Sequence, residues 1–140
     1  MLQNNGEGVQ HIALYTPDIF ATLRHMRAAA EVGGFELQQR PATSYYAGAR
    51  QRVGSALSEQ QYAQCEELGV LADKDDAEGV LLQVFTKPVG DRPTLFLEVI
   101  QRIGCIDATG DQRPGCGGFG KGNFRDLFKS IEDFEKTLKI

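Results

Sequence analysis

The sequence predicts an α+β domain in which a β-α-β-β-β unit is followed by a terminal helix. An alternating strand pattern and then a long amphipathic helical pattern come first in the chain. Three further strand patterns follow one another between residues 70 and 102, with turn residues between them. Because these strands are consecutive, the order favours a largely antiparallel sheet. The length of 140 residues suits one domain of this kind, or half of a larger one.

The first strand and the long helix are the clearest elements. The strand is expected over residues 9–16, where side chains alternate between two faces. Thr16 would cap the following helix, and Pro17 suits its first helical position, where the missing N–H is not needed. Gly33 and Gly34 predict the end of this helix. Apolar residues recur along it at helical spacing: Ile19, Phe20, Leu23, Met26 and Ala30.

An insertion separates this helix from the later strands. Residues 35–39 are compatible with a short strand, and residues 41–69 hold two helical stretches. The first of these, over residues 44–53, has only a weak helical pattern. The second has a clear start, because Ser58 and Gln61 have the spacing of a capping box. The insertion is therefore expected to add two helical stretches to the unit.

Three strands, a loop and a helix complete the predicted order. The strands are expected over residues 70–75, 80–86 and 95–102. Residues 104–118 are rich in glycine and predict a loop. Asn123 is expected to cap the last helix. The apolar stripe of that helix consists of Leu127, Ile131, Phe134 and Leu138.

Composition and charge exclude several classes of protein. Hydrophobic residues make up 41% of the chain and charged residues 24%, which is typical of a globular domain. The net charge is −4, and no long basic run is present, so nucleic-acid binding has little electrostatic support. No apolar stretch approaches the length of a membrane span.

Cysteine usage bears on the compartment. The three cysteines, Cys65, Cys105 and Cys116, cannot all pair within the chain, and none has Cys-x-x-Cys spacing. A reducing compartment is therefore the simplest expectation. The cytoplasm fits this expectation, and so does an organelle whose targeting peptide lies outside the sequence.

Three polar residues lie within otherwise apolar strand patterns. His11, Gln83 and Glu98 each occur on a different predicted strand, with apolar residues on the same face. A carboxylate at such a place is costly to bury unless a cation or strong donors meet it. A histidine and a carboxylate are two of the three ligands in non-haem iron oxygenases. We therefore expect a small-molecule or metal site on this face.

Simpler interpretations of these residues are also open. His11 would fit a core position in which its ring bonds to the backbone, and Glu98 would fit an edge strand facing water. His25 is the other histidine and is expected on the surface of the first helix. The glycine-rich segment 117–124 suits either a lid over a pocket or a plain joint between loop and helix. It lacks the spacing of a phosphate-binding loop.

Four segments carry a resemblance to a known family. They are Gly-Val-Gln-His-Ile-Ala-Leu at 8–14, Leu-Leu-Gln-Val-Phe-Thr-Lys-Pro at 81–88, Asp-Arg-Pro-Thr-Leu-Phe-Leu-Glu-Val-Ile-Gln-Arg at 91–102, and 117–124. In this order they resemble the C-terminal part of the 4-hydroxyphenylpyruvate dioxygenase family. The sister enzyme 4-hydroxymandelate synthase shares the fold and the iron site of that family. The resemblance implies the vicinal oxygen chelate fold, in which paired β-α-β-β-β modules surround a metal.

The resemblance also implies a site. The family holds Fe(II) with two histidines and one glutamate, and His11 and Glu98 match the second histidine and the glutamate. Residues 119–127 match the gating helix of the family. Positions that match the substrate pocket are Gln10, Gln83, Phe85, Phe96, Phe119, Asn123, Phe124 and Leu127.

The reaction implied is conversion of 4-hydroxyphenylpyruvate and O2 to homogentisate and CO2, in tyrosine and phenylalanine breakdown. The first iron-ligand histidine of the family lies upstream of the segment that this chain matches. The 140 residues are thus expected to form a single module, the C-terminal half of a catalytic domain, that is inactive without its upstream module. A non-catalytic module that pairs with a copy of itself and binds a ligand or metal is the alternative, and 4-hydroxymandelate synthase is a second one.

Overall fold

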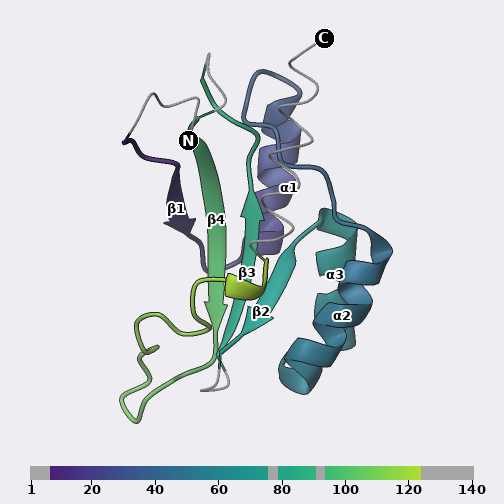
Figure 1. The fold of residues 1–140 in the computed structure, drawn as a ribbon. Helices are drawn as coiled ribbons and strands as arrows, with labels where there is room; N and C mark the ends of the chain where they lie inside the picture. The colour runs from purple at the N-terminus through teal and green to yellow at the C-terminus, as the bar shows by residue number, and fades with distance from the viewer. Residues whose placement is uncertain (1–6, 76–78, 91–93, 124–140) are drawn as a thin grey trace.

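The computed structural model describes residues 7–75, 79–90 and 94–123, and its four strands form one sheet (Figure 1). Their order across the sheet is β1-β4-β3-β2. β1 runs parallel to β4, and the other neighbouring pairs are antiparallel. The predicted α+β class and the largely antiparallel sheet are confirmed. The strands are β1 (His11–Tyr15), β2 (Leu71–Lys74), β3 (Val80–Phe85) and β4 (Phe96–Ile103).

The α-helices pack against one face of this sheet. They are α1 (Ile19–Ala30), α2 (Thr43–Val53) and α3 (Glu59–Leu68), with the 3-10 turn η2 (Gly54–Ala56) after α2. Figure 1 shows α2 and α3 side by side next to β2, and α1 nearer the middle of the sheet. The main core lies between these helices and the strands. Its buried members include Ile19, Leu23, Tyr46, Val53, Tyr62, Cys65, Leu68, Leu82, Val84 and Val99.

The helix starts agree with the sequence at α3 and differ at α1. Ser58 and Gln61 form the predicted capping box of α3. At α1 the expected cap at Thr16 is wrong, because the Asp18 side chain accepts the bond from the Ala21 backbone N–H at 3.1 Å. Thr16 Oγ1 lies 2.7 Å from Thr22 Oγ1 instead. Pro17 therefore precedes the cap, so its expected place at the first helical position is also wrong.

One further expected element differs from the structure, and another lies outside the described residues. The short strand expected at residues 35–39 appears as a single bridge between Leu37 and Thr86. The expected terminal helix lies outside the described residues. Before it, residues Lys121–Asn123 form the 3-10 turn η3. The backbone N–H of Asn123 donates to the Gly120 carbonyl at 2.8 Å and closes this turn.

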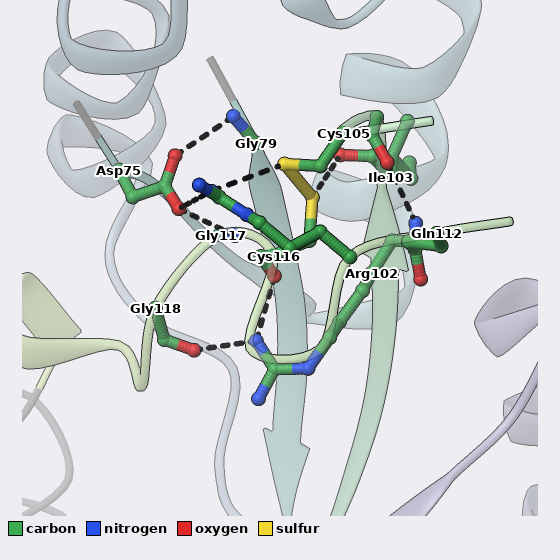
Figure 2. Close-up of polar contacts among 11 residues, drawn as sticks. Asp75, Gly79, Arg102, Ile103, Cys105, Gln112, Cys116, Gly117 and Gly118 are labelled. Atoms are coloured by element: carbon green, nitrogen blue, oxygen red, sulfur yellow. Dashed lines mark hydrogen bonds and ion pairs between the residues drawn. A yellow bond between two sulfur atoms is a disulfide. The ribbon is translucent and has the colours of Figure 1, made fainter. Parts of the chain in front are cut away.

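The loop after β4 is fastened to the strands by several polar contacts (Figure 2). The Asp75 carboxylate accepts the backbone N–H of Gly79 at 2.8 Å and of Gly117 at 2.9 Å. Arg102 donates to the carbonyls of Cys116 and Gly118 at 2.6 Å each. These contacts hold the loop against the ends of β2, β3 and β4. From there the chain continues to Asn123.

A disulfide between Cys105 and Cys116 closes the same loop. The expectation that the cysteines are reduced is therefore wrong for this pair. Sequence spacing gave no sign of it, because the partners are brought together by the turn that the loop makes beside β3 (Figure 2). Cys65 is a free cysteine on the buried side of α3. The compartment of the protein stays a prediction.

Candidate metal centre

Three neighbouring strands place His11, Glu98 and Gln83 on the face of the sheet opposite the main core. Residues paired across a ladder project to the same face. Glu98 pairs with Phe85, and Gln83 pairs with Ile100 two residues further along β4. His11 pairs with Phe96, two residues before Glu98. The pairing therefore gathers one polar side chain from each of β1, β4 and β3 on one surface.

The carboxylate of Glu98 has a partner at each oxygen. Its Oε2 lies 3.2 Å from His11 Nε2, and its Oε1 accepts a bond of 2.7 Å from Gln83 Nε2. Glu98 is 7% exposed and Gln83 is 1% exposed. These contacts satisfy a carboxylate that would otherwise be costly to bury. The interpretation of Glu98 as a solvent-facing edge residue is thus wrong.

The imidazole of His11 is oriented from two sides. Its Nδ1 lies 3.2 Å from Gln10 Oε1, and its ring stacks on Phe96 with centroids 5.1 Å apart. An amide oxygen accepts, so a proton on Nδ1 satisfies this contact and leaves the lone pair of Nε2 directed at Glu98. Nε2 of His11 and Oε2 of Glu98 are then both acceptors, and at 3.2 Å they repel each other. A proton or a metal ion between them removes that repulsion.

Apolar side chains surround this polar pair. Phe85 and Phe96 meet edge to face, with ring centroids 5.9 Å apart, and both are 3% exposed. Leu71 packs with them, and the ring of Tyr45 packs on the same cluster. An apolar wall with a few polar groups is the usual form of a small-molecule site.

The structure adds one residue that the sequence did not indicate. Tyr45 donates its hydroxyl proton to Asn123 Oδ1 at 2.6 Å, and Asn123 Nδ2 donates to Gln83 Oε1 at 2.6 Å. Asn123 is fully buried. Tyr45 lies in the weakly patterned insertion. Tyr46 follows it directly, and the sequence gave no local sign of which of the two tyrosines would reach the site, although neighbouring side chains of a helix point in different directions.

One other predicted pocket residue, Phe119, is exposed and contacts a different side chain. Phe119 is 76% exposed, and the guanidinium carbon of Arg102 lies 5.5 Å from the centroid of the Phe119 ring. Phe124 and Leu127 lie outside the described residues. His25 is exposed on α1, which packs on the opposite face. His25 is therefore not placed to join His11 and Glu98.

The His11–Glu98 pair fits two adjacent positions of a metal. Ligand atoms at about 2.1 Å from an ion in neighbouring octahedral positions lie about 3.0 Å apart. The separation of 3.2 Å between Nε2 and Oε2 is close to this value. Within residues 7–75, 79–90 and 94–123, no three His, Cys, Asp or Glu side chains are placed to hold a metal together. The same ranges contain no helix with the length and hydrophobicity of a membrane span.

A β-α-β-β-β sheet with a histidine and a glutamate on one face defines a module of the vicinal oxygen chelate class. Two solved structures agree. A fusion of a xylose isomerase-like TIM barrel with 4-hydroxyphenylpyruvate dioxygenase is 28% identical over 90% of this chain and 17% of its own, with a TM-score of 0.66. A mutant 4-hydroxymandelate synthase from Streptomyces coelicolor is 30% identical over 94% of this chain and 32% of its own, with a TM-score of 0.65. No family model matches.

Curated relatives are more similar still. The 4-hydroxyphenylpyruvate dioxygenases of Plectranthus scutellarioides and Hordeum vulgare are 59% and 60% identical to 97% of this chain, and each match spans 32% of the relative. Relatives of the same name from Neurospora crassa and Danio rerio are 45% and 44% identical. The chain is thus homologous to the C-terminal part of the 4-hydroxyphenylpyruvate dioxygenases, and spans about a third of the length of the curated relatives it matches.

Proposed function

We propose that this chain is the glutamate-bearing module of an Fe(II)-dependent 4-hydroxyphenylpyruvate dioxygenase. The enzyme would convert 4-hydroxyphenylpyruvate and O2 to homogentisate and CO2. The observation that carries the proposal is the buried Glu98, which meets His11 at 3.2 Å and Gln83 at 2.7 Å on an aromatic wall. Sequence identity of 56–60% to four plant relatives with this name supports it.

In this proposal His11 and Glu98 hold the iron. A neutral imidazole and a carboxylate are the donor types that non-haem Fe(II) takes. Bound Fe(II) would supply open positions at which the α-keto acid chelates and O2 is activated. Gln10 and Phe96 keep the His11 ring in the orientation that directs Nε2 at the ion, and Gln83 keeps Glu98 from turning away.

The substrate ring would lie against Phe85 and Phe96. Both rings are 3% exposed and pack edge to face, and a dry wall protects a reactive intermediate from side reactions. Gln83 has a second amide proton, which it can offer to a polar group of the substrate while it holds Glu98. Gln10 and Asn123 add polar groups at the edge of this wall. By sequence alone, Phe119, Phe124 and Leu127 would belong to the part of the chain that covers it.

A third iron ligand is needed from outside the described residues, because His11 and Glu98 supply two. We assign it to a histidine on an upstream module of the same enzyme. The surface of β1 supports such pairing, since β1 lies at one edge of the sheet. Three of its apolar side chains are 48–62% exposed: Ile12, Leu14 and Tyr15. Exposed apolar groups of this kind commonly mark an interface.

The test is product formation by the complete protein, meaning this chain joined to its upstream module. With 4-hydroxyphenylpyruvate, Fe(II) and ascorbate we expect O2 uptake and homogentisate. His11→Ala and Glu98→Gln should abolish both, whereas the matched change His25→Ala on exposed α1 should leave them unchanged. Turnover that survives His11→Ala would contradict the assignment of the metal centre.

The second candidate is 4-hydroxymandelate synthase, which the similarity to a solved structure of that enzyme favours. The same incubation separates the two, because hydroxylation at the benzylic carbon gives 4-hydroxymandelate in place of homogentisate. A third outcome, a stable homodimer that binds metal without turnover, would favour the non-catalytic self-pairing module.

A further inference from the structure

A chain of four hydrogen bonds leads from the edge of the sheet to Glu98. The Ala72 backbone N–H donates to the Tyr45 hydroxyl oxygen at 2.9 Å, and this hydroxyl donates to Asn123 Oδ1 at 2.6 Å. Asn123 Nδ2 donates to Gln83 Oε1 at 2.6 Å, and Gln83 Nε2 donates to Glu98 Oε1 at 2.7 Å. The two amide side chains in the middle are at most 1% exposed.

This chain can run in only one direction. An ionised carboxylate accepts and never donates, so Gln83 must turn its NH2 group toward Glu98. Its carbonyl oxygen then faces Asn123, which must also present NH2. The carbonyl of Asn123 then requires a donor, and the Tyr45 hydroxyl supplies it. The carboxylate therefore sets the orientation of both amides, and the hydroxyl at the far end supplies the donor that this orientation requires.

Tyr45 is fixed in place by contacts other than its bond to Asn123, and its hydroxyl also lies 3.2 Å from the Ala72 carbonyl oxygen. Its oxygen accepts from Ala72 in β2, and its ring packs on the cluster of Leu71, Phe85 and Phe96. The Arg52 guanidinium lies 5.3 Å from the ring centroid. A phenylalanine at this position would keep the ring contacts and lose the hydrogen bonds of the hydroxyl to Ala72 and Asn123.

From this geometry we propose that Tyr45 is a positioning residue for the metal centre. It acts through Asn123 and Gln83 and fixes the direction in which Glu98 presents its free oxygen. Without the hydroxyl, the buried carbonyl of Asn123 has lost its donor, so the Asn123 amide is no longer held at both ends. An amide that is held less firmly orients Gln83 less firmly, and Gln83 in turn orients Glu98 less firmly.

The inference rests on the proposed function, in which Glu98 is a metal ligand. The experiment is a Co(II) titration of the complete protein, followed by visible absorption, for Tyr45→Phe and Tyr46→Phe. Tyr46 is the matched control, because it lies on the same helix and its buried hydroxyl donates to the Cys65 carbonyl at 3.2 Å, away from the site. Loss of an orienting partner of this type costs about tenfold in metal affinity.

We expect Tyr45→Phe to weaken Co(II) binding about tenfold and to change the ligand-field bands, with Tyr46→Phe like the wild type. In a Gln83→Met background, Tyr45→Phe should have no further effect. Equal affinities and spectra for the two tyrosine variants would overturn the inference. Wild-type protein that binds Co(II) without making homogentisate would instead contradict the proposed function alone.

A second measurement needs no metal. In protein labelled with 15N at asparagine, the side-chain amide of Asn123 should shift and exchange faster with solvent in Tyr45→Phe than in Tyr46→Phe. Unchanged amide signals in Tyr45→Phe would also overturn the inference.

Discussion

Gly120 lies directly against the amide of Gln83, and its replacement by alanine tests how firmly that amide is held. A Cβ at this position would overlap Gln83 Oε1 and lie 2.6 Å from its Cδ and 2.7 Å from its Nε2. Gln83 cannot easily move away, because Glu98 and Asn123 hold both ends of its amide. Gly120 also has φ +75°, which side chains other than glycine's adopt at a cost.

Gly115→Ala is the matched control. Gly115 has φ +74°, and a Cβ there would have no atom within 4 Å. The backbone cost alone is about 1–2 kcal/mol, and it applies to both variants. Overpacking against a held side chain adds about 1–3 kcal/mol. Gly120→Ala should therefore lower the free energy of unfolding by about 2–5 kcal/mol, and Gly115→Ala by about 1–2 kcal/mol.

Urea unfolding of the two variants measures this difference. With a slope of about 1–3 kcal/mol per molar urea, the midpoint of Gly120→Ala should lie about 1 M below that of Gly115→Ala. Co(II) binding should weaken only in Gly120→Ala, because displacement of Gln83 releases Glu98. Equal urea midpoints for the two variants would refute this expectation, because the contact with Gln83 would then add nothing to the loss of stability.

Three further predictions concern the loop, the core and the isolated chain. Replacing Cys105 and Cys116 by serine removes a cross-link with a sequence separation of 11 and should lower the free energy of unfolding by about 2–3 kcal/mol. A dithiol reductant should lower the thermal midpoint of the wild type and leave that of the double variant unchanged; a wild type indifferent to the reductant would contradict this. Burial raises the pKa of the Cys65 thiol from 9.0 to about 12. The unfolded chain therefore loses this proton first as the pH rises above 9, and stability should fall by up to about 1.4 kcal/mol per pH unit. Urea unfolding at pH 9 and pH 10 should show a smaller loss in Cys65→Ala, and equal losses would count against a buried thiol. The 140-residue chain without its upstream module should bind Fe(II) weakly and form no homogentisate, because a site with two ligands lacks the geometry of the triad. Turnover by that chain, abolished by His11→Ala, would show that the module is a working enzyme alone.

The strands and two of the helices could be predicted because their patterns reflect burial. Val80–Phe85 is buried at every position, and its apolar run predicted a strand. Glu98 and Gln83 stood out for the same reason, since a polar residue inside such a run needs a partner. The sequence thus indicated the face on which the site lies.

The sequence could not indicate contacts that depend on tertiary structure. Asp18 and Thr16 are both good caps, and only the path of the chain after β1 decides that Asp18 reaches the helix. Tyr45 lies in a helix with little amphipathic pattern, so nothing local distinguished its role from that of Tyr46. The pairing of Cys105 with Cys116 depends on the fold of the loop between them.

The parallel pairing of β1 with β4 has a kinetic consequence. The contact between His11 and Glu98 closes a loop of chain that contains α1, α2 and α3, whereas β2, β3 and β4 follow one another closely. Closing a long loop costs entropy before its contacts compensate, so we expect β1 to dock late in folding. Interactions that form after the transition state affect the unfolding rate and not the folding rate. A divalent ion held by His11 and Glu98 should therefore slow unfolding while the chain folds at the same rate with or without it.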